Sequence, residues 1–244
     1  MGSGSIKLFR FAGVNVSLHF SWFLVAIYQM TSRSHGYISP VFAFYEYLAL
    51  FGIVLMHEFG HALACRQTGG TADRIMLWPL GGVAFVQPPQ RPGAQLWSIA
   101  AGPLVNVALL PVIELVHFAA LRAGWMFSKP DTFHLIHMVR FINFGLLVFN
   151  LFPVYPLDGG QILRSLLWFP LGQIRSLQIA TAIGLIGGAA IVLFAFYIQS
   201  IWIGILAFFL LSQAWNGWKH AQALATEAAE AKRMGAESER PPML

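Results

Sequence analysis

The sequence predicts an all-α polytopic membrane protein of about six transmembrane helices, with a small membrane-associated β hairpin or sheet. Hydrophobic residues make up 57% of the 244-residue chain and charged residues only 10%, whereas a soluble domain carries about 25% charged residues. The apolar residues gather in several runs, and a run of roughly 20 such residues can cross a bilayer as a helix. One run carries three polar side chains on a single helical turn, which is unusual because polar side chains are costly at membrane depth.

The N-terminal part of the chain is expected to enter the membrane early. Residues Met1–Ser5 are rich in glycine and serine, and we exclude them from the fold as a flexible lead. The apolar run over about Val16–Met30 predicts the first span, and no cleavable signal is evident. The formal charge of +5 would suggest nucleic acid in a soluble protein. In a membrane protein basic residues belong in the loops, so we expect no nucleic-acid partner.

The second predicted span, about Pro40–Arg66, contains the three polar residues His57, Glu58 and His61. On a helix the two histidines lie one turn apart, so both imidazoles can bind one metal ion. Glu58 is close enough to reach a metal-bound water without being a ligand, which is the H-E-x-x-H arrangement of zinc hydrolases. Polar side chains are costly at membrane depth. A shared zinc ion therefore explains the turn best.

The segment Ile75–Val86 predicts a hairpin or short strands near this site. It is too short to span a membrane, is rich in strand formers, and is interrupted by Pro79 and Gly81-Gly82. Strand edges cannot face lipid, so the segment is expected to line a cavity. Its free edge would be a template on which an extended substrate segment could add as a further strand.

Four more spans are expected after this hairpin: about Gln95–Leu121, Thr132–Phe152, Leu177–Tyr197 and Ser200–Trp215. Asn106, in the first of them, can bond across a helix contact, which the small residues around it allow to be close. The last two spans are separated by so few residues that they should form an antiparallel hairpin. Residues 219–244 then form a charged tail outside the membrane.

Basic residues predict that both termini are cytoplasmic, because lysine and arginine concentrate on that side of a membrane. With six spans and the N-terminus inside, the outer side holds Arg33, Arg122 and Lys129. The inner side holds many more: Lys7, Arg10, Arg66, Arg74, Arg91, Arg164, Arg175, Lys219, Lys232, Arg233 and Arg240.

A catalytic zinc site usually has three protein ligands and one open position. Asp158 is the best candidate for the third, because Pro153 and Pro156 break the preceding helix and present it on irregular backbone at the correct end of its span. Cys65 lies one turn beyond His61 and could in principle join. Three ligands from one helix, however, rarely close a tetrahedron.

These motifs resemble the site-2 protease family of intramembrane zinc metalloproteases. The resemblance rests on His57-Glu58-x-x-His61, on Asn150-x-x-Pro153 continuing to Leu157-Asp158-Gly159, and on the Gly81-Gly82 region between them. It covers about Val41–Leu163, the core of what we expect to be a single membrane-embedded metalloprotease domain over residues 1–244. Unlike in some members, we expect no PDZ domain and no paired cystathionine-synthase-type domains within these 244 residues.

The resemblance implies one Zn²⁺ per chain, held by His57, His61 and Asp158, with Glu58 as the catalytic base and acid. It also implies that Asn150 acts near the substrate carbonyl. The expected activity is cleavage of a transmembrane segment of another protein, in the lipid bilayer of a bacterial or archaeal cell. Two other readings stay open from the residues alone: a polytopic metal transporter, which gains nothing from Glu58, and a catalytically inactive membrane scaffold.

Overall fold

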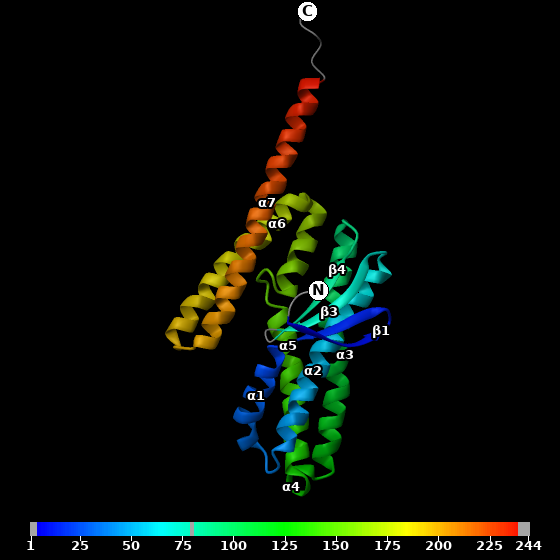
Figure 1. The fold of residues 1–244 in the computed structure, drawn as a ribbon, viewed down its shortest axis with the longest axis vertical. Helices are drawn as coiled ribbons and strands as arrows, with labels where there is room; N and C mark the ends of the chain where they lie inside the picture. The colour runs from blue at the N-terminus through cyan, green and yellow to red at the C-terminus, as the bar shows by residue number, and fades with distance from the viewer. Residues whose placement is uncertain (1–3, 79–80, 239–244) are drawn as a thin grey trace, which may run out of the picture. The chain divides into compact units, whose positions relative to one another are not determined.

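The computed structural model describes residues 4–78 and 81–238, which form two compact units, Met1–Leu151 and Phe152–Leu244. The first unit contains a four-stranded sheet and helices α1 to α5, and the second contains α6 and α7 (Figure 1). Among the described residues, five helices are long and apolar enough to cross a membrane: α2, α3, α5, α6 and α7. A mostly helical membrane protein with a small sheet is thus confirmed.

The N-terminal segment does not form the predicted span over Val16–Met30. It forms two strands, β1 (Ser5–Phe11) and β2 (Val14–His19), followed by α1 (Trp22–Arg33). In β2 every second residue is apolar, which is the period of a strand. The 12 residues of α1 extend only about 18 Å, less than the thickness of a bilayer. Ser5, which we assigned to a flexible lead, begins β1.

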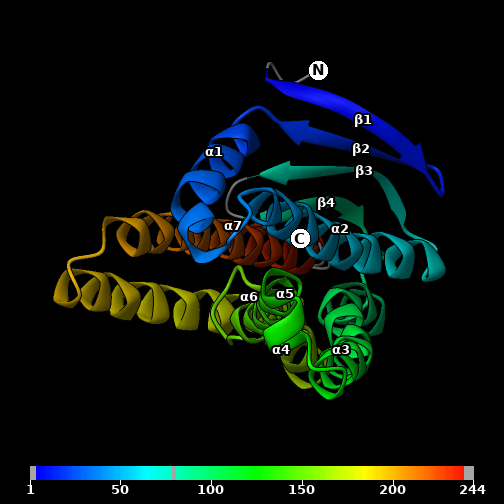
Figure 2. The ribbon, with the colours of Figure 1, turned by 90° about the horizontal axis from the view of Figure 1, so that it is seen from below.

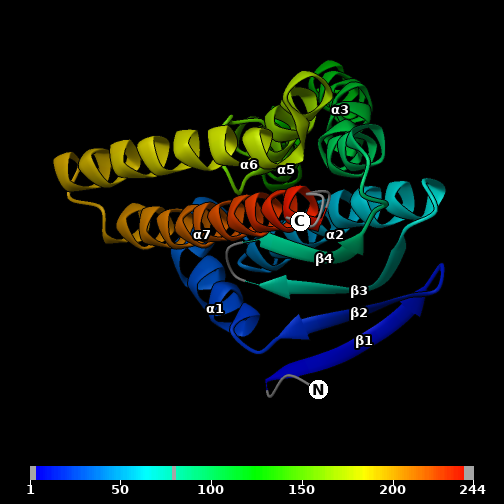
Figure 3. The ribbon, with the colours of Figure 1, turned by 90° about the horizontal axis from the view of Figure 1, so that it is seen from above.

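The predicted hairpin is confirmed as β3 (Thr71–Trp78) and β4 (Gly81–Gln87), which pair antiparallel. The sheet order is β1-β2-β3-β4 (Figures 2 and 3). The pairing of β1 with β2 is antiparallel, and that of β2 with β3 is parallel. Since β1 and β4 are the outer strands, each leaves one edge without a strand partner in the described part of the chain.

The sheet packs on α2 (Val41–Gln67), and the apolar core of the first unit lies between them. Its buried members come from the strands, α1 and α2: Val14, Val16, Leu18, Trp22, Tyr47, Val54, Ala62, Cys65, Ala72, Ile75 and Leu77. Arg66, near the end of α2, donates to the carbonyl oxygens of Ala12 and Gly13. The turn between β1 and β2 is thereby fixed at the C-terminal end of α2.

A buried carboxylate ties α1 to the other half of α2. Glu46 is 1% exposed and accepts hydrogen bonds from Gln29 (2.8 Å), Arg33 (3.0 Å) and the Tyr37 hydroxyl (2.6 Å). Tyr37 follows the short 3-10 helix η1 (Ser34–Gly36). Burial and the neighbouring Glu46 carboxylate raise the pKa of Tyr37, because both disfavour a phenolate. Together α1 and the sheet cover the two halves of α2.

The remaining helices of the first unit agree with the predicted spans. They are α3 (Pro92–Arg122) and α5 (Pro130–Asn150), joined by the short α4 (Trp125–Ser128). Both α3 and α5 begin with proline at the first helical position, where its missing N–H costs nothing. The chain turns back at α4, so that α3 and α5 lie side by side and antiparallel, and α3 also packs on α2.

The second unit consists of α6 (Asp158–Tyr197) and α7 (Ile201–Ser238). At Gly172 the backbone (φ 79°, ψ 170°) breaks α6 into two segments, and the second runs beside α7 as the predicted antiparallel hairpin (Figure 3). The first segment contains the short piece 162–169 that lies before the span. The charged tail continues α7 without interruption as far as Ser238; residues 239–244 lie outside the described part.

Candidate metal centre

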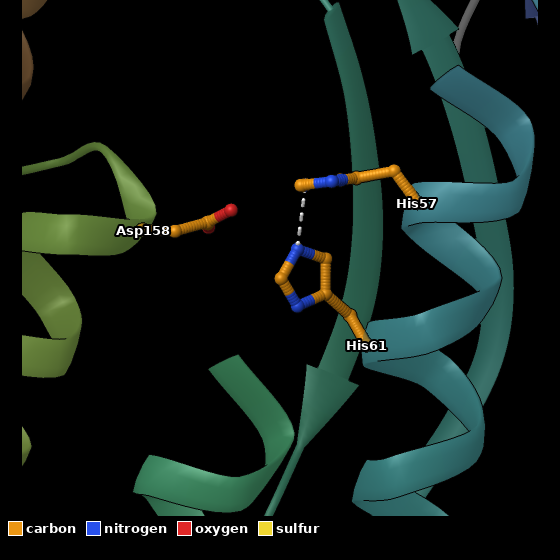
Figure 4. Close-up of side chains that lie close together, drawn as sticks. All are labelled: His57, His61 and Asp158. Carbon is orange, nitrogen blue, oxygen red and sulfur yellow. Dashed lines mark hydrogen bonds between the residues drawn. The ribbon is translucent and has the colours of Figure 1, made fainter. Parts of the chain in front are cut away.

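His57 and His61 lie one turn apart on α2, and both are buried, at 3% and 6% exposure. Their Nε2 atoms are 3.1 Å apart (Figure 4). Two nitrogens bound to one tetrahedral zinc, each at 2.0–2.1 Å, would be about 3.3 Å apart. The spacing in the structure therefore suits two ligands of one ion.

The opposite nitrogen of each ring is held by α3. The Nδ1 atom of His57 lies 2.6 Å from Oδ1 of Asn106, and Nδ1 of His61 lies 2.9 Å from the carbonyl oxygen of Ser98. A carbonyl oxygen can only accept, so each Nδ1 carries a hydrogen, and in the neutral form of either ring the lone pair is then at Nε2. Two lone pairs facing one space are stabilised by a cation between them. The donor chemistry thus fits a metal ion.

Gly102, on α3, makes room beside these two nitrogens. A Cβ atom added there would lie 2.3 Å from Nε2 of His61 and 2.8 Å from Nε2 of His57. Real Cβ atoms do not approach other atoms so closely, so any larger residue would fill the space that faces both lone pairs. The glycine leaves a cradle of the size that an ion requires.

Asn106 is itself fixed by a second buried amide. Its Nδ2 donates to Oδ1 of Asn143 on α5 (2.8 Å), and Nδ2 of Asn143 donates back to the Asn106 carbonyl (3.0 Å). Both side chains are fully buried. The expected cross-helix bond of Asn106 is confirmed. The sequence patterns assigned no role at the site to Ser98, Gly102 or Asn143. Small or polar residues at positions 98, 102 and 106 of an apolar helix do form a stripe with helical spacing, which could have indicated the first two.

Glu58 lies on the neighbouring face of α2 and reaches the sheet. It is 6% exposed, and its Oε2 accepts the amide hydrogen of Ala84 on β4 (2.8 Å). A Cβ atom added to Gly82 would lie 2.2 Å from Cγ of Glu58, so only glycine lets the strand approach this closely. The Gly81-Gly82 segment thus brings β4 against the carboxylate.

Asp158 is the first residue of α6, and 9% of it is exposed. A carboxylate is favoured in the first turn of a helix, whose N-terminus carries partial positive charge. Among the described residues, His57, His61 and Asp158 are the group of metal-ligating types whose ligand atoms all lie within 4.8 Å of one another (Figure 4). The alternative ligand Cys65 is not in this group; its Sγ instead lies 3.4 Å from the Thr71 carbonyl.

Asn150 is the last residue of α5 and is half-buried. It lies at the junction between this helix and the irregular segment that follows. A cavity of about 490 Å³ lies further along α3 and α5 and is lined in part by the ion pair of Glu114 and Arg140. It does not include the histidines of α2.

Comparison with known proteins identifies related sequences. The sequence profile of peptidase family M50 matches residues 45–123 and 124–195. A zinc metalloprotease of Methanocaldococcus jannaschii is 31% identical over 182 residues, which are 74% of this chain and 50% of that protein. Stage IV sporulation protein FB of Bacillus subtilis is 32% identical over 148 residues, 59% of this chain and 44% of that protein. The chain spans about half the length of these two relatives.

A solved structure has the same fold. The site-2 protease from Methanocaldococcus jannaschii superposes with a TM-score of 0.61 at 27% sequence identity. The match covers 88% of this chain and 95% of that one.

Proposed function

Because this chain belongs to peptidase family M50, we propose that it is a zinc metalloendopeptidase that hydrolyses a peptide bond within a transmembrane segment of another protein. One observation carries the proposal. The two buried imidazoles on α2 present their Nε2 atoms 3.1 Å apart, with both Nδ1 atoms engaged and a glycine opposite. Asp158 supplies the third ligand of the expected type, and one zinc would be bound per chain.

The chemistry that zinc supplies when bound is acidification of water, towards a pKa of ~7, and polarisation of a carbonyl group. Glu58 takes the proton from the attacking water and later returns it to the leaving nitrogen. The amide of Ala84 holds one carboxylate oxygen, so the carboxyl group keeps a fixed direction during both transfers. Asn150, at the end of α5, is proposed to bind the substrate carbonyl through its amide.

The depth of the histidines supports a substrate within the membrane. His61 lies six residues and His57 ten residues before Gln67, the last residue of α2, or roughly 9 and 15 Å along the helix. The site is therefore inside a span, offset towards the sheet. A substrate helix must unwind to expose its carbonyl, and its freed N–H and C=O groups would then need partners.

We propose that the sheet end of the first unit faces the cytoplasm. The N-terminal segment forms strands and a short helix instead of the predicted first span, but this does not change the side assigned to the sheet. The turn between β1 and β2 lies beside Arg66, at the C-terminal end of α2, and α1 leads back towards the start of α2. The sheet end carries Lys7, Arg10, Arg66, Arg74 and Arg91. The opposite end carries fewer basic residues: Arg33, Arg122 and Lys129. This bias has the sign of the positive-inside rule.

The deciding experiment is the substitution Glu58→Gln in the full chain. The amide cannot take the proton of water but can still accept the Ala84 hydrogen bond through its oxygen. We expect unchanged zinc content and a loss of cleavage of at least about 10²-fold, the contribution typical of a general base. Zinc is measured by atomic absorption, and cleavage on a membrane-embedded test substrate.

The other two functions predict different results in the same experiment. A metal transporter would keep its transport in Glu58→Gln, and an inactive scaffold would show no cleavage before the substitution. Transport also needs metal ligands distributed along a path, whereas the described residues contain the single group on which this proposal rests. Retained proteolysis in Glu58→Gln would contradict the proposed mechanism.

A further inference from the structure

The segment that precedes Asp158 has few backbone bonds of its own. Between α5 and α6, the amide of Val154 donates to the carbonyl of Phe152 (2.7 Å), and that of Leu157 to the carbonyl of Val154 (2.9 Å). These bonds join residues only two and three positions apart. A metal ligand must nevertheless be held in place closely, because small displacements weaken coordination. The side chain of Gln161 adds one bond, from its Nε2 to the Pro156 carbonyl (2.9 Å), and the rest of the support comes from packing.

The packing comes from the second segment of α6, beyond the break at Gly172. A Cβ atom added to Gly184 would lie 2.6 Å from the carbonyl oxygen of Tyr155 and 3.0 Å from its Cβ atom. One added to Gly187 would lie 2.6 Å from Cγ2 of Val154. Two consecutive residues of the segment thus rest directly on helix backbone, which is possible only where the helix has no side chain.

The ring of Tyr155 is received by α7. A Cβ atom added to Gly217 would lie 2.8 Å from Cε1 of Tyr155 and 2.8 Å from Cγ2 of Thr181. Glycines on both helices of the hairpin therefore contact one tyrosine, whose backbone lies on α6 and whose ring lies on α7. We call Gly184 and Gly217 the glycine socket.

We propose that Tyr155 is a positioning residue for Asp158, and that the glycine socket of the α6–α7 hairpin sets the metal affinity of the site through it. The inference rests on the proposed function, since it takes Asp158 as a zinc ligand. Tyr155 lies three residues before Asp158, and the first turn of α6 closes on it: a Cβ atom added to Gly160 would lie 2.3 Å from the Tyr155 amide nitrogen. A shift of Tyr155 must therefore move the start of α6.

The test measures zinc affinity of the purified full chain in detergent, by competition with a chelator. Gly217→Ala displaces the ring and Gly184→Ala displaces the backbone of Tyr155. Each should weaken zinc binding about 10- to 100-fold, the effect of losing a group that orients a ligand. Tyr155→Ala should do the same, and Tyr155→Phe, which keeps the ring, should bind zinc as the unmodified protein does.

Two alanine variants of the same hairpin are the controls. Gly188→Ala strains the contact between α6 and α7, because the new Cβ would lie 2.7 Å from Cδ2 of Leu211, but that contact does not involve Tyr155. Gly204→Ala on α7 has nothing within 4 Å. Both should keep the zinc affinity of the unmodified protein, even if Gly188→Ala lowers the unfolding temperature.

Cobalt(II) in place of zinc gives a second readout that a purely structural defect would not produce. The visible absorption bands of cobalt depend on its ligands, so Gly217→Ala should give the spectrum of Asp158→Ala, and Gly188→Ala the unmodified spectrum. One result would overturn the role of Tyr155 but leave the proposed function intact: Gly184→Ala and Gly217→Ala bind zinc as tightly as Gly188→Ala, while Asp158→Ala binds it weakly. Unchanged affinity in Asp158→Ala would overturn the proposed ligand set as well. If a glycine variant fails to fold, the Tyr155→Ala and Tyr155→Phe pair decides.

Discussion

At the scale of single residues, the geometry of the site depends on the groups of α3 that hold the two histidine rings. The hydrogen bonds of His57 to Asn106 and of His61 to the Ser98 carbonyl determine which nitrogen of each ring faces the ion. We therefore expect metal affinity to depend on α3 as well as on the histidines, because outer partners orient the ligands. Gly102 adds the space between them.

Replacing the third ligand should remove most of the metal. In Asp158→Ala only the two imidazoles remain, and two ligands hold zinc weakly. We expect less than about one tenth of the zinc of the unmodified protein after dialysis against a chelator, because loss of a residue that only orients a ligand already weakens binding about 10-fold or more. Full occupancy would remove Asp158 from the coordination sphere.

Filling the cradle should have a similar result without touching a ligand. In Gly102→Ala the new methyl group meets both Nε2 atoms, so we expect zinc affinity at least about 10-fold lower. Gly145→Ala on α5, where nothing lies within 4 Å, is the matched control and should bind zinc normally. Affinities are compared by isothermal titration in the same detergent. Equal affinities would show that the histidines can move aside.

The His-Glu-x-x-His turn could be recognised from sequence because its three polar residues stand out in an apolar span and share one helical face. The roles of Gly102 and Asn143 at the site could not be assigned in the same way, even though position 102 belongs to a stripe of small and polar residues. A glycine in a membrane helix serves close packing far more often than it clears space for an ion, and an asparagine reveals its partner only once the helices are placed.

At the scale of elements, β4 is the strand closest to the chemistry. Along it exposure alternates: Ala84 and Val86 are partly buried against the core, whereas Val83 and Phe85 are exposed. The amide of Ala84, which bonds to Glu58, lies on the edge that is not paired with β3. An unwound substrate could satisfy its own backbone groups on that edge.

Crosslinking can test this strand addition. In a Glu58→Gln background, which should preserve the complex, single cysteines at positions 83 to 86 are combined with cysteines near the cleavage site of the substrate. Crosslinks should peak at alternate positions, because successive side chains of a strand point to opposite faces. Complete absence of crosslinks, with substrate shown to be bound, would leave the hairpin a structural role only.

Helices formed by one long apolar run could be predicted from the sequence. A run that is divided between a strand and a helix could not. The spans of α2, α3 and α5 follow from long apolar runs. Residues Val16–Met30 are mostly apolar, yet the first part pairs with β3 and the second part forms α1. Composition could not separate them, because the partner strand lies far along the chain.

At the scale of the whole molecule, orientation in the membrane is the property to measure. A reagent that reacts with thiols but does not cross membranes should label Ser128→Cys, beside α5, in intact cells. It should label Gln90→Cys, just before α3, only after permeabilisation, because the sheet end is proposed to be cytoplasmic. Both positions are exposed, and the native Cys65 is buried. The reverse pattern would place the sheet outside.

The parallel pairing of β2 with β3 has a consequence for the order in which the protein is made. Asn15 pairs with Arg74, and all of α1 and α2 lies between these strands. Strands so far apart in the sequence pair late in folding, because the intervening chain must first fold and lose its conformational entropy. Ser98, Gly102 and Asn106 leave the ribosome later still. A nascent chain therefore carries the His-Glu-x-x-His turn before it has the means to hold a metal, and the proposed site is complete only when α3 and then Asp158, at the start of α6, have followed.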